Sequence, residues 1–388
     1  MTQITAMNSI TGRMAAALLL ALALVLGAGG AAHAIDTEAK QAILVEYDTH
    51  AVLFEKNADE LMHPSSMSKM MTVDILFEHL KNGSVKLDDE LPVSEKAWRM
   101  QGSKMFVAVG SKVKVEDLIR GIVVQSGNDA CIAVAEGLDG SEEAYVEEMN
   151  RRAKEIGLTN STFKNVTGWP DPEHLTTARD LALLARRTIA DFPEYYRYYS
   201  ELNFTYNGIK QGNRNPLLYK DLGADGLKTG HTEQGGYGIT GSAKRGERRL
   251  ILVLNGLSSM KSRAEESEKM MDWGFREFDN YALFKAGDTV SDAEVWLGDA
   301  ATVPLAIESD VKVTLPRKSR RAMKVTVNYD GPIAAPIVKG TKIAKLVIAA
   351  PDVDPIEIPL VAGADVGKLG FSGRVVAALR HVVWGSIQ

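Results

Sequence analysis

The feature that most constrains the fold is a change of pattern near residues 281–287. Before it, segments with apolar residues at helical spacing lie between an early pair of short β-rich runs and two late ones. After it, residues 289–358 hold alternating β runs, punctuated by prolines and a turn at Asp330 and Gly331. The pattern therefore predicts an α+β domain over residues 35–280, and a small all-β sandwich domain over residues 281–366.

Within the first part, the predicted order is a hairpin, then helices, then strands. Two apolar runs around a polar turn predict the hairpin over residues 42–55. Asn128 is the predicted N-cap of the third helix. Helices between an early hairpin and late strands indicate an antiparallel sheet flanked by helices. The helices are predicted at residues 67–80, 115–124, 129–137, 141–157 and 177–189, and the late strands at residues 236–243 and 249–254.

Residues 1–34 have the pattern of a signal peptide. Arg13 precedes an apolar run over residues 14–26, and the small residues that follow end on Ala32, His33 and Ala34. The apolar run is short for a membrane span. We expect cleavage after Ala34 and export of the mature chain; the alternative is an uncleaved N-terminal anchor.

Residues 367–388 differ again. At helical spacing, the apolar residues Phe371, Val375, Leu379 and Val382 cluster on one side of this segment. It is too short and too charged to span a bilayer, but it suits a helix that lies in the membrane surface. The alternative is a terminal helix docked on the protein's own β domain.

Composition excludes several classes of function. A net charge of -5 gives no global basic field of the kind that nucleic-acid binding needs. None of the seven histidines has another histidine four residues away, so no zinc-peptidase helix can form. The single cysteine, Cys131, lies among apolar neighbours and is predicted as a buried small hydrophobe. We therefore expect chemistry without a metal or a cofactor, and no nucleic-acid partner.

The first of three motifs is Ser66-Met67-Ser68-Lys69, in the first turn of the predicted helix 67–80. Residues i and i+3 share one face of a helix, so Lys69 can reach the Ser66 hydroxyl. An ammonium desolvated between helices has a lowered pKa and can act as the base that a serine nucleophile requires. The alternative is a capping serine beside a solvated lysine.

The second motif is Ser126-Gly127-Asn128, in a connection between two apolar helices. Such a loop can present a hydroxyl and a carboxamide into a cleft. Ser126 would relay a proton to the leaving amine, and Asn128 would hold a substrate amide. The alternative is a polar turn between helices with a cap.

The third motif is Lys228-Thr229-Gly230, which is followed by His231 and a strand-like run over residues 237–242. A glycine on a strand that lines a cleft lets a peptide approach the backbone and pair as an added strand. Lys228 would add positive charge near the nucleophile, and Thr229 a hydroxyl for a substrate carboxylate. The alternative is a β-turn with an exposed lysine.

In this order, the three motifs match the set of penicillin-binding proteins and class A β-lactamases. The chain resembles the low-molecular-mass penicillin-binding proteins that are serine-type D-alanyl-D-alanine carboxypeptidases, over residues 39–366. The resemblance is carried by residues 64–72, 125–130 and 225–232. It implies a transpeptidase-type domain, a small β-rich domain and a C-terminal amphipathic anchor.

The resemblance also implies catalytic roles. Ser66 would attack the carbonyl of the penultimate D-alanine, with Lys69 as its base, and the backbone N–H groups of Ser66 and His231 would hold the oxyanion. Ser126, Lys228 and Lys69 would share protons during acylation and deacylation. Which lysine serves as the base in each step stays open.

Further residues correspond to the family's substrate contacts. Thr229 and Arg214 would bind the terminal carboxylate beside Gly230, and Arg263 is a second candidate that is equally well explained as a surface charge. One departure concerns Thr167, which stands where close relatives often carry histidine. A deacylation role for that histidine therefore does not transfer to this chain.

The implied partners follow from the same resemblance. They are peptidoglycan stem peptides that end in D-Ala-D-Ala, β-lactam antibiotics, and a membrane surface bound through residues 367–388. The implied location is the periplasmic face of the cytoplasmic membrane.

Three other functions stay open on this fold. A serine β-lactamase uses the same acylation chemistry, but the extra β domain and terminal helix disfavour it. A non-catalytic peptidoglycan-binding protein would not need a serine beside a base. A D,D-endopeptidase cleaves the same bond type in a cross-link, and the choice depends on the shape of the pocket.

Overall fold

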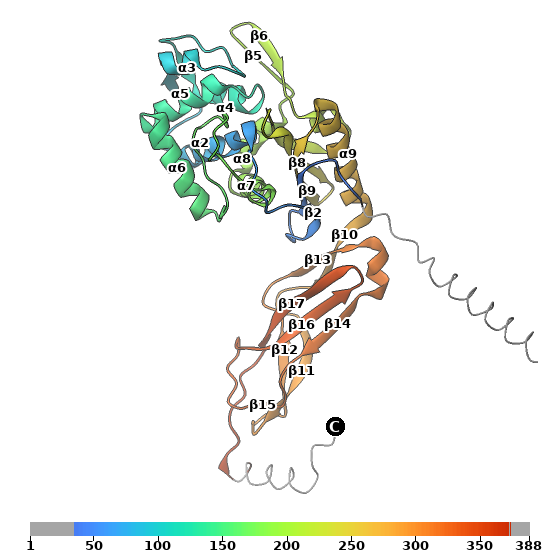
Figure 1. Ribbon diagram of the computed structural model, residues 1–388. Coiled ribbons are helices and arrows are strands. Elements are labelled where there is room, and N and C mark those ends of the chain that lie inside the picture. Colours follow the sequence, from blue (N-terminus) through green and yellow to red (C-terminus); the bar gives the residue numbers. More distant parts are fainter. Residues whose placement is uncertain (1–34, 372, 374–388) are drawn as a thin grey trace, which may run out of the picture. The chain divides into compact units, whose positions relative to one another are not determined.

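The computed structural model describes residues 35–371 and 373 (Figure 1). The predicted signal peptide, residues 1–34, and nearly all of the apolar face predicted for residues 367–388 lie outside the described residues. Within the described part of the chain, no helix is both long and apolar enough to cross a membrane.

A five-stranded antiparallel sheet forms the centre of the first domain, in the strand order β2-β1-β9-β8-β7. The predicted hairpin supplies β1 and β2, and the predicted late strands supply β8 and β9. The bounds are β1 (Gln41–Glu46), β2 (Val52–Lys56), β7 (Ala224–Thr232), β8 (Gly236–Arg245) and β9 (Arg248–Leu257). Strand β7, which begins one residue before Asp225, therefore forms one edge of this sheet.

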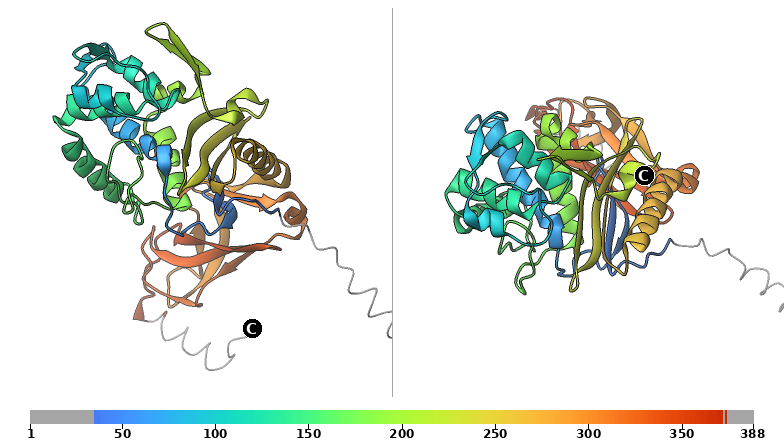
Figure 2. Two further views of the ribbon diagram at one scale, coloured as in Figure 1. Left: turned by 45° about the horizontal axis from the view of Figure 1, so that its top comes forward. Right: turned by 90° about the horizontal axis from the view of Figure 1, so that it is seen from above.

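Both faces of this sheet carry helices (Figure 2). Successive strand residues point to opposite faces, and the central strands are apolar on both. On one face lies α9 (Met260–Glu277), where a Cβ added at Gly274 would meet Leu44 and Leu250 within 2.8 Å. A larger residue here would require the two leucine side chains to shift. Helix α9 is not among the elements that the sequence analysis predicted.

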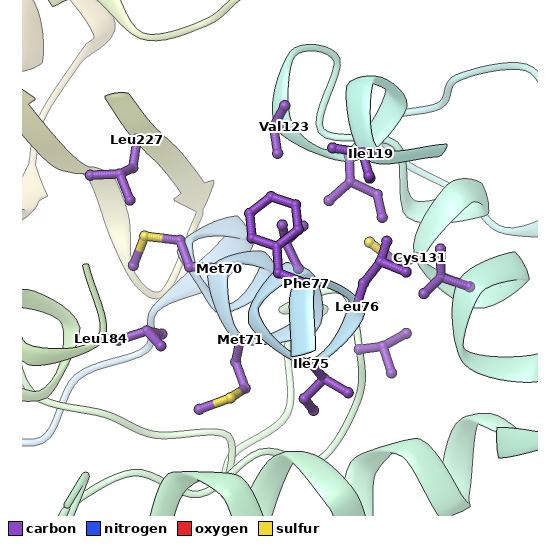
Figure 3. Packing of buried hydrophobic residues seen from close by; sticks show 14 of the residues in the cluster. Met70, Met71, Ile75, Leu76, Phe77, Ile119, Val123, Cys131, Leu184 and Leu227 are labelled. Carbon is purple, nitrogen blue, oxygen red and sulfur yellow. The ribbon is translucent and has the colours of Figure 1, made fainter. Parts of the chain in front are cut away.

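The other face of the sheet is covered by a helical layer around α2 (Lys69–Lys81), which is buried on nearly its whole circumference. Figure 3 shows Phe77, Leu76 and Met70 of α2 packed among residues of the surrounding elements. A helix buried on all sides is held firmly in place by close packing. Its first residue, Lys69, is therefore fixed by the core.

The remaining elements of this domain are the other helices, three short 3-10 helices and four small strands. The 3-10 helices are η1 (Ser65–Ser68), η2 (Arg197–Ser200) and η3 (Pro216–Tyr219), the small strands are β3 (Glu90–Pro92), β4 (Lys112–Lys114), β5 (Asn203–Tyr206) and β6 (Ile209–Gly212), and the helices are α3 (Glu95–Arg99), α4 (Val115–Val123), α5 (Asn128–Asp139), α6 (Glu142–Glu155), α7 (Ala178–Asp191) and α8 (Pro193–Tyr196).

The second domain is all-β, as predicted, apart from the short 3-10 helix η4 (Arg317–Ala322). Strand β10 (Phe278–Phe284) pairs with β13 (Val311–Pro316), and a six-stranded sheet has the order β14-β16-β17-β12-β11-β15. Alternating apolar residues of these strands form a separate core. The bounds of the larger sheet are β11 (Thr289–Trp296), β12 (Thr302–Ala306), β14 (Lys324–Asn328), β15 (Ile333–Ala334), β16 (Lys342–Ala350) and β17 (Val353–Ala362).

Candidate active site

Ser66 and Lys69 are in direct contact. Lys69 Nζ donates a hydrogen bond to Ser66 Oγ over 2.9 Å. The structure corrects one local prediction, because the α-helix begins at Lys69 and Ser66 lies in the preceding 3-10 helix η1. In a 3-10 helix, residues i and i+3 are eclipsed, which aligns the two side chains more directly than an α-helical turn does.

The backbone around Ser66 is conformationally strained. Ser65, immediately before it, has φ of +51°, a left-handed conformation that costs a non-glycine residue about 1–3 kcal/mol. Gly168 and Gly230 approach this turn from two sides. A Cβ added at Gly168 would lie 1.8 Å from the Ser65 carbonyl oxygen, and one added at Gly230 would lie 2.8 Å from the Pro64 carbonyl oxygen. The turn is thus held between two backbone segments that only glycine permits.

Lys69 is completely buried, and no carboxylate contacts its ammonium group among the hydrogen bonds and ion pairs of the described residues. Its Nζ donates a second hydrogen bond to the Thr167 carbonyl oxygen over 2.5 Å. Burial lowers the pKa of Lys69 to about 8, with a further contribution from the positive charge of Arg214. Near pH 8 a substantial fraction of Lys69 is therefore neutral, and this is the form that can accept a proton from a neighbouring hydroxyl.

Ser126 lies in the turn between α4 and α5, and Asn128 is the first residue of α5. Ser126 is buried with φ of +62°, and its Oγ has no hydrogen-bond partner within the described residues. The predicted N-cap is wrong, because Gly127 is the N-cap of α5 and Asn128 is already helical. The Asn128 side chain instead donates to the Gln101 carbonyl oxygen over 2.7 Å. The free hydroxyl of Ser126 is thus available to an exogenous group.

The third motif lies on the edge strand β7, which contacts η1. Lys228 and Thr229 are buried, and Lys228 Nζ donates to the Thr229 carbonyl oxygen over 3.1 Å. Burial, together with the charges of Lys69 and Arg214, holds the pKa of Lys228 well below its usual value. A Cβ added at Gly230 would lie 3.2 Å from the Ser66 backbone nitrogen, so β7 passes directly beside Ser66.

The His231 side chain, in contrast, is exposed and stacks on Tyr237, with ring centroids 3.9 Å apart. Its predicted contribution is a backbone N–H, which does not depend on the imidazole. The structure therefore gives the side chain a packing contact on the β7–β8 hairpin.

Arg214 is exposed, and its Nη1 donates to Ser103 Oγ over 2.5 Å. The second candidate, Arg263, is buried rather than on the surface. Its Nη2 donates to the Arg214 carbonyl oxygen over 3.3 Å, and its guanidinium lies 5.8 Å from the centre of the Tyr237 ring. Arg263 therefore supports the backbone that carries Arg214.

The site is electropositive. The positive charge of Arg214 lowers the pKa of both Lys69 and Lys228, and the charge of Lys69 also lowers the pKa of Lys228. Such a cluster of cations favours a ligand that carries an anionic group. In the described part of the chain, no group of three or more His, Cys, Asp or Glu side chains is arranged to hold a metal ion.

Two contributors were missed by sequence reasoning. The Asp129 carboxylate accepts hydrogen bonds from the backbone N–H groups of Met105 and Phe106, both at 2.8 Å, and so fixes the loop that carries Ser103. The other is the Thr167 carbonyl oxygen. The position of Asp129, next to the second motif, was an available signal, whereas a backbone carbonyl carries no residue-type signal.

Comparison with known proteins identifies both domains. Residues 29–258 match the peptidase S11 family, described as D-alanyl-D-alanine carboxypeptidase. Residues 278–368 match the family described as penicillin-binding protein 5, C-terminal domain.

Similar proteins cover most of the chain. D-alanyl-D-alanine carboxypeptidase DacA of Haemophilus influenzae is 38% identical over 339 residues, 86% of either chain. DacC of Escherichia coli is 39% identical over 348 residues, 88% of this chain and 87% of the relative. The crystal structure of penicillin-binding protein 5 from H. influenzae has a TM-score of 0.78 at 37% identity, and covers 86% of this chain and 99% of its own.

A smaller relative has been solved with β-lactams. Penicillin-binding protein D2 of Listeria monocytogenes, in its ampicillin-bound form, is 30% identical with a TM-score of 0.58. It covers 62% of this chain and 99% of its own length.

Proposed function

The chain belongs to the D-alanyl-D-alanine carboxypeptidase family, and we propose that it removes the terminal D-alanine from peptidoglycan pentapeptides through an acyl-enzyme on Ser66. The observation that carries this proposal is the hydrogen bond of 2.9 Å between Ser66 Oγ and the buried Nζ of Lys69. A hydroxyl nucleophile beside a base of lowered pKa is the arrangement that acyl transfer requires.

In the acylation step, neutral Lys69 accepts the Ser66 proton as Oγ bonds to the carbonyl carbon of the penultimate D-alanine. The negative charge that develops on the carbonyl oxygen is stabilised by the backbone N–H groups of Ser66 and His231. The C–N bond then breaks, and the leaving D-alanine nitrogen takes a proton through Ser126. The unpartnered Oγ of Ser126 supports this role.

Deacylation adds water to the same carbonyl carbon, releases Ser66 Oγ with a proton, and frees the shortened peptide. Lys69, Lys228 and Ser126 are the groups that exchange protons in this step. Both lysines have lowered pKa values because they are buried, so each can alternate between neutral and charged forms.

Substrate binding uses the edge of β7 and the electropositive end of the site. The peptide pairs with β7 beside Gly230, and its backbone amide meets the Asn128 carboxamide. Thr229 and Arg214 bind the terminal carboxylate, because a charge-assisted hydrogen bond contributes more than a neutral one.

The experiment is to incubate the mature chain with penicillin and locate the adduct by mass spectrometry. We expect one adduct on Ser66, since the β-lactam amide resembles the D-Ala-D-Ala bond, and none in Ser66→Ala. Wild-type protein should also release D-alanine from a pentapeptide faster than it cleaves a cross-linked dimer. An adduct on Ser68 or Ser126 would mean that Ser66 is not the nucleophile, and preferential cleavage of the dimer would favour the endopeptidase.

The chain's two ends suggest where it works. We propose export through residues 1–34, and peripheral attachment of residues 367–388 to the outer face of the cytoplasmic membrane. Within the described residues, Phe371 is 80% exposed, as expected of an apolar side chain that enters lipid. Full burial of each large apolar residue contributes about 1.5–3 kcal/mol, and less at an interface.

Removal of residues 372–388 should abolish sedimentation with anionic vesicles while D-alanine release is retained. The cut after Phe371 leaves the backbone pairing of Gly298 with Lys368 intact, so the β domain keeps its edge. If the shortened chain sediments as well as the full mature chain does, the terminal segment is not the anchor.

A further inference from the structure

His174 lies outside the three motifs, in the loop that contacts the turn at Ser65 and Ser66, which is called the nucleophile turn below. The loop of residues 163–174 is closed at its base by backbone hydrogen bonds between Thr162 and Leu175, each near 3 Å. The next residue, Thr176, pairs in the same way with Met62, shortly before η1. His174 is therefore held next to the point where this loop joins the segment that leads to Ser66.

The His174 ring is buried and has a partner for each nitrogen. Its Nδ1 accepts a hydrogen bond from the backbone N–H of Lys164 over 3.2 Å, so in the neutral ring Nε2 carries the proton. Nε2 lies 2.8 Å from Ser68 Oγ and donates to it. The Phe163 ring packs against the imidazole edge to face. One neutral side chain thus joins both ends of the loop to the first motif.

The same loop touches α2 at two further points. Thr72 Oγ1 donates to the Val166 carbonyl oxygen over 2.7 Å, and Lys69 Nζ donates to that of Thr167 over 2.5 Å. Lys69 is fully buried, and the Thr167 carbonyl of this loop is one of the two hydrogen-bond partners of its ammonium group. Displacement of the loop would therefore remove an acceptor from Lys69 and hydrate its ammonium group.

We propose that His174 is a positioning residue, which clips the loop of residues 163–174 to Ser68 and so keeps the Thr167 carbonyl against Lys69 in a water-free site. This inference rests on the proposed function, in which Lys69 is the base. His174 acts through the loop and touches no reacting atom.

The surroundings of His174 keep its imidazole ring neutral. Burial is the main cause that lowers the pKa of His174 to about 4. The nearby charges are Asp171 of the same loop, which favours protonation, and His63 and Lys69, which oppose it. Protonation of Nδ1 would break the hydrogen bond from Lys164. The hydrogen bonds of His174 with Lys164 and Ser68 are therefore maintained throughout the pH range in which Lys69 loses its proton.

The test measures acylation of Ser66 by penicillin from pH 6 to pH 9.5. His174→Phe places an aromatic ring without nitrogens at this position, and Ser68→Ala removes the hydroxyl that accepts the hydrogen bond from His174. In both, hydration should raise the pKa of Lys69 by about one unit, which slows acylation about tenfold at pH 7 and much less at pH 9.5. His174→Gln, whose amide can still donate to Ser68, should recover part of the rate.

The matched control is His79→Phe. His79 and Ser84 form a hydrogen bond of the same 2.8 Å length near the other end of α2, and this variant should acylate within about twofold of wild type. A rate reduced by the same factor at every pH, or not reduced at all, in both His174→Phe and Ser68→Ala would overturn the proposal.

Nitrogen-15 NMR of the histidines separates this proposal from the proposed function, because it needs no acylation. His174 should show the Nε2–H tautomer and stay neutral at pH 5.5. An Nδ1–H tautomer, or protonation by pH 6, would overturn the clip. Wild-type protein that forms no adduct on Ser66 would instead contradict the proposed function.

Discussion

Replacing Lys69 by methionine is expected to slow acylation of Ser66 by about 10³-fold, within the range of about 10²–10⁴ that a general base contributes. Methionine has an unbranched apolar side chain only one heavy atom shorter than that of lysine, so the packing of α2 is expected to be retained. The loss comes from the missing proton acceptor beside Ser66 Oγ. The rate is measured as the appearance of the penicillin adduct by intact-mass spectrometry.

The same variant should be more stable than wild type at pH 7. The pKa of Lys69 falls from 10.5 in the unfolded chain to about 8 when folded, so below pH 8 the folded state carries a cost of about 3 kcal/mol. This cost decreases as the pH rises from 8 to 10.5, where both states become neutral. The stability advantage of Lys69→Met should disappear over that interval, as denaturant unfolding at several pH values would reveal.

Lys81→Met is the control for this prediction, because Lys81 is the last residue of the same helix and is exposed. Its acylation rate should lie within about twofold of the wild-type rate. Its unfolding free energy should differ from that of wild type by no more than about 0.5 kcal/mol at each pH. Acylation of Lys69→Met within tenfold of wild type would show that another group is the base.

The sequence motifs predicted which side chains meet at the candidate site, because side-chain chemistry at fixed spacing is what a motif records. The spacing of Ser66 and Lys69 required only that they share a face of one helical turn, and this is found. The type of turn was not predictable in the same way. The left-handed Ser65 lies against Gly168 and Gly230, which come from distant segments of the chain.

The misassigned Asn128 has a similar cause. Asparagine commonly caps helices, so the local sequence predicts Asn128 as the cap. The backbone at Ser126 is left-handed, however, and Gly127 is the cap. The carboxamide is then turned toward the Gln101 carbonyl, a long-range contact that local preference does not predict. Tertiary contacts overrode a helix-end preference worth about 1 kcal/mol.

Helix α9 shows the opposite case, a signal that was present and missed. Ser259 caps this helix by accepting from the Ser262 N–H. Its apolar stripe is short and interrupted by many charged residues, so the periodic signal is weak. The close contact of Gly274 with the sheet could not be read from the sequence, since it depends on Leu44 and Leu250.

Replacing Gly168 by alanine is expected to cause a second large loss of activity, about 10²-fold in the acylation rate, together with a lower melting temperature. Gly168 has φ of +74°, and an added Cβ would lie 1.8 Å from the Ser65 carbonyl oxygen and 3.1 Å from the Ser66 nitrogen. This overlap involves backbone atoms, so the loop and the nucleophile turn must separate. A displacement near 1 Å at a reacting group costs about this factor.

The contribution of steric overlap can be separated from that of backbone strain with Gly83→Ala. Gly83 has nearly the same φ, +78°, but no atom lies within 4 Å of the added Cβ. That variant should therefore show only the cost of a left-handed alanine, about 1–2 kcal/mol in unfolding free energy, and an unchanged acylation rate.

Because Gly168 also adjoins Thr167, its alanine variant should lose the contact of the Thr167 carbonyl with Lys69, and the rate deficit should shrink at high pH. Equal acylation rates in the two variants would mean that the approach of the loop to Ser66 does not control the reaction.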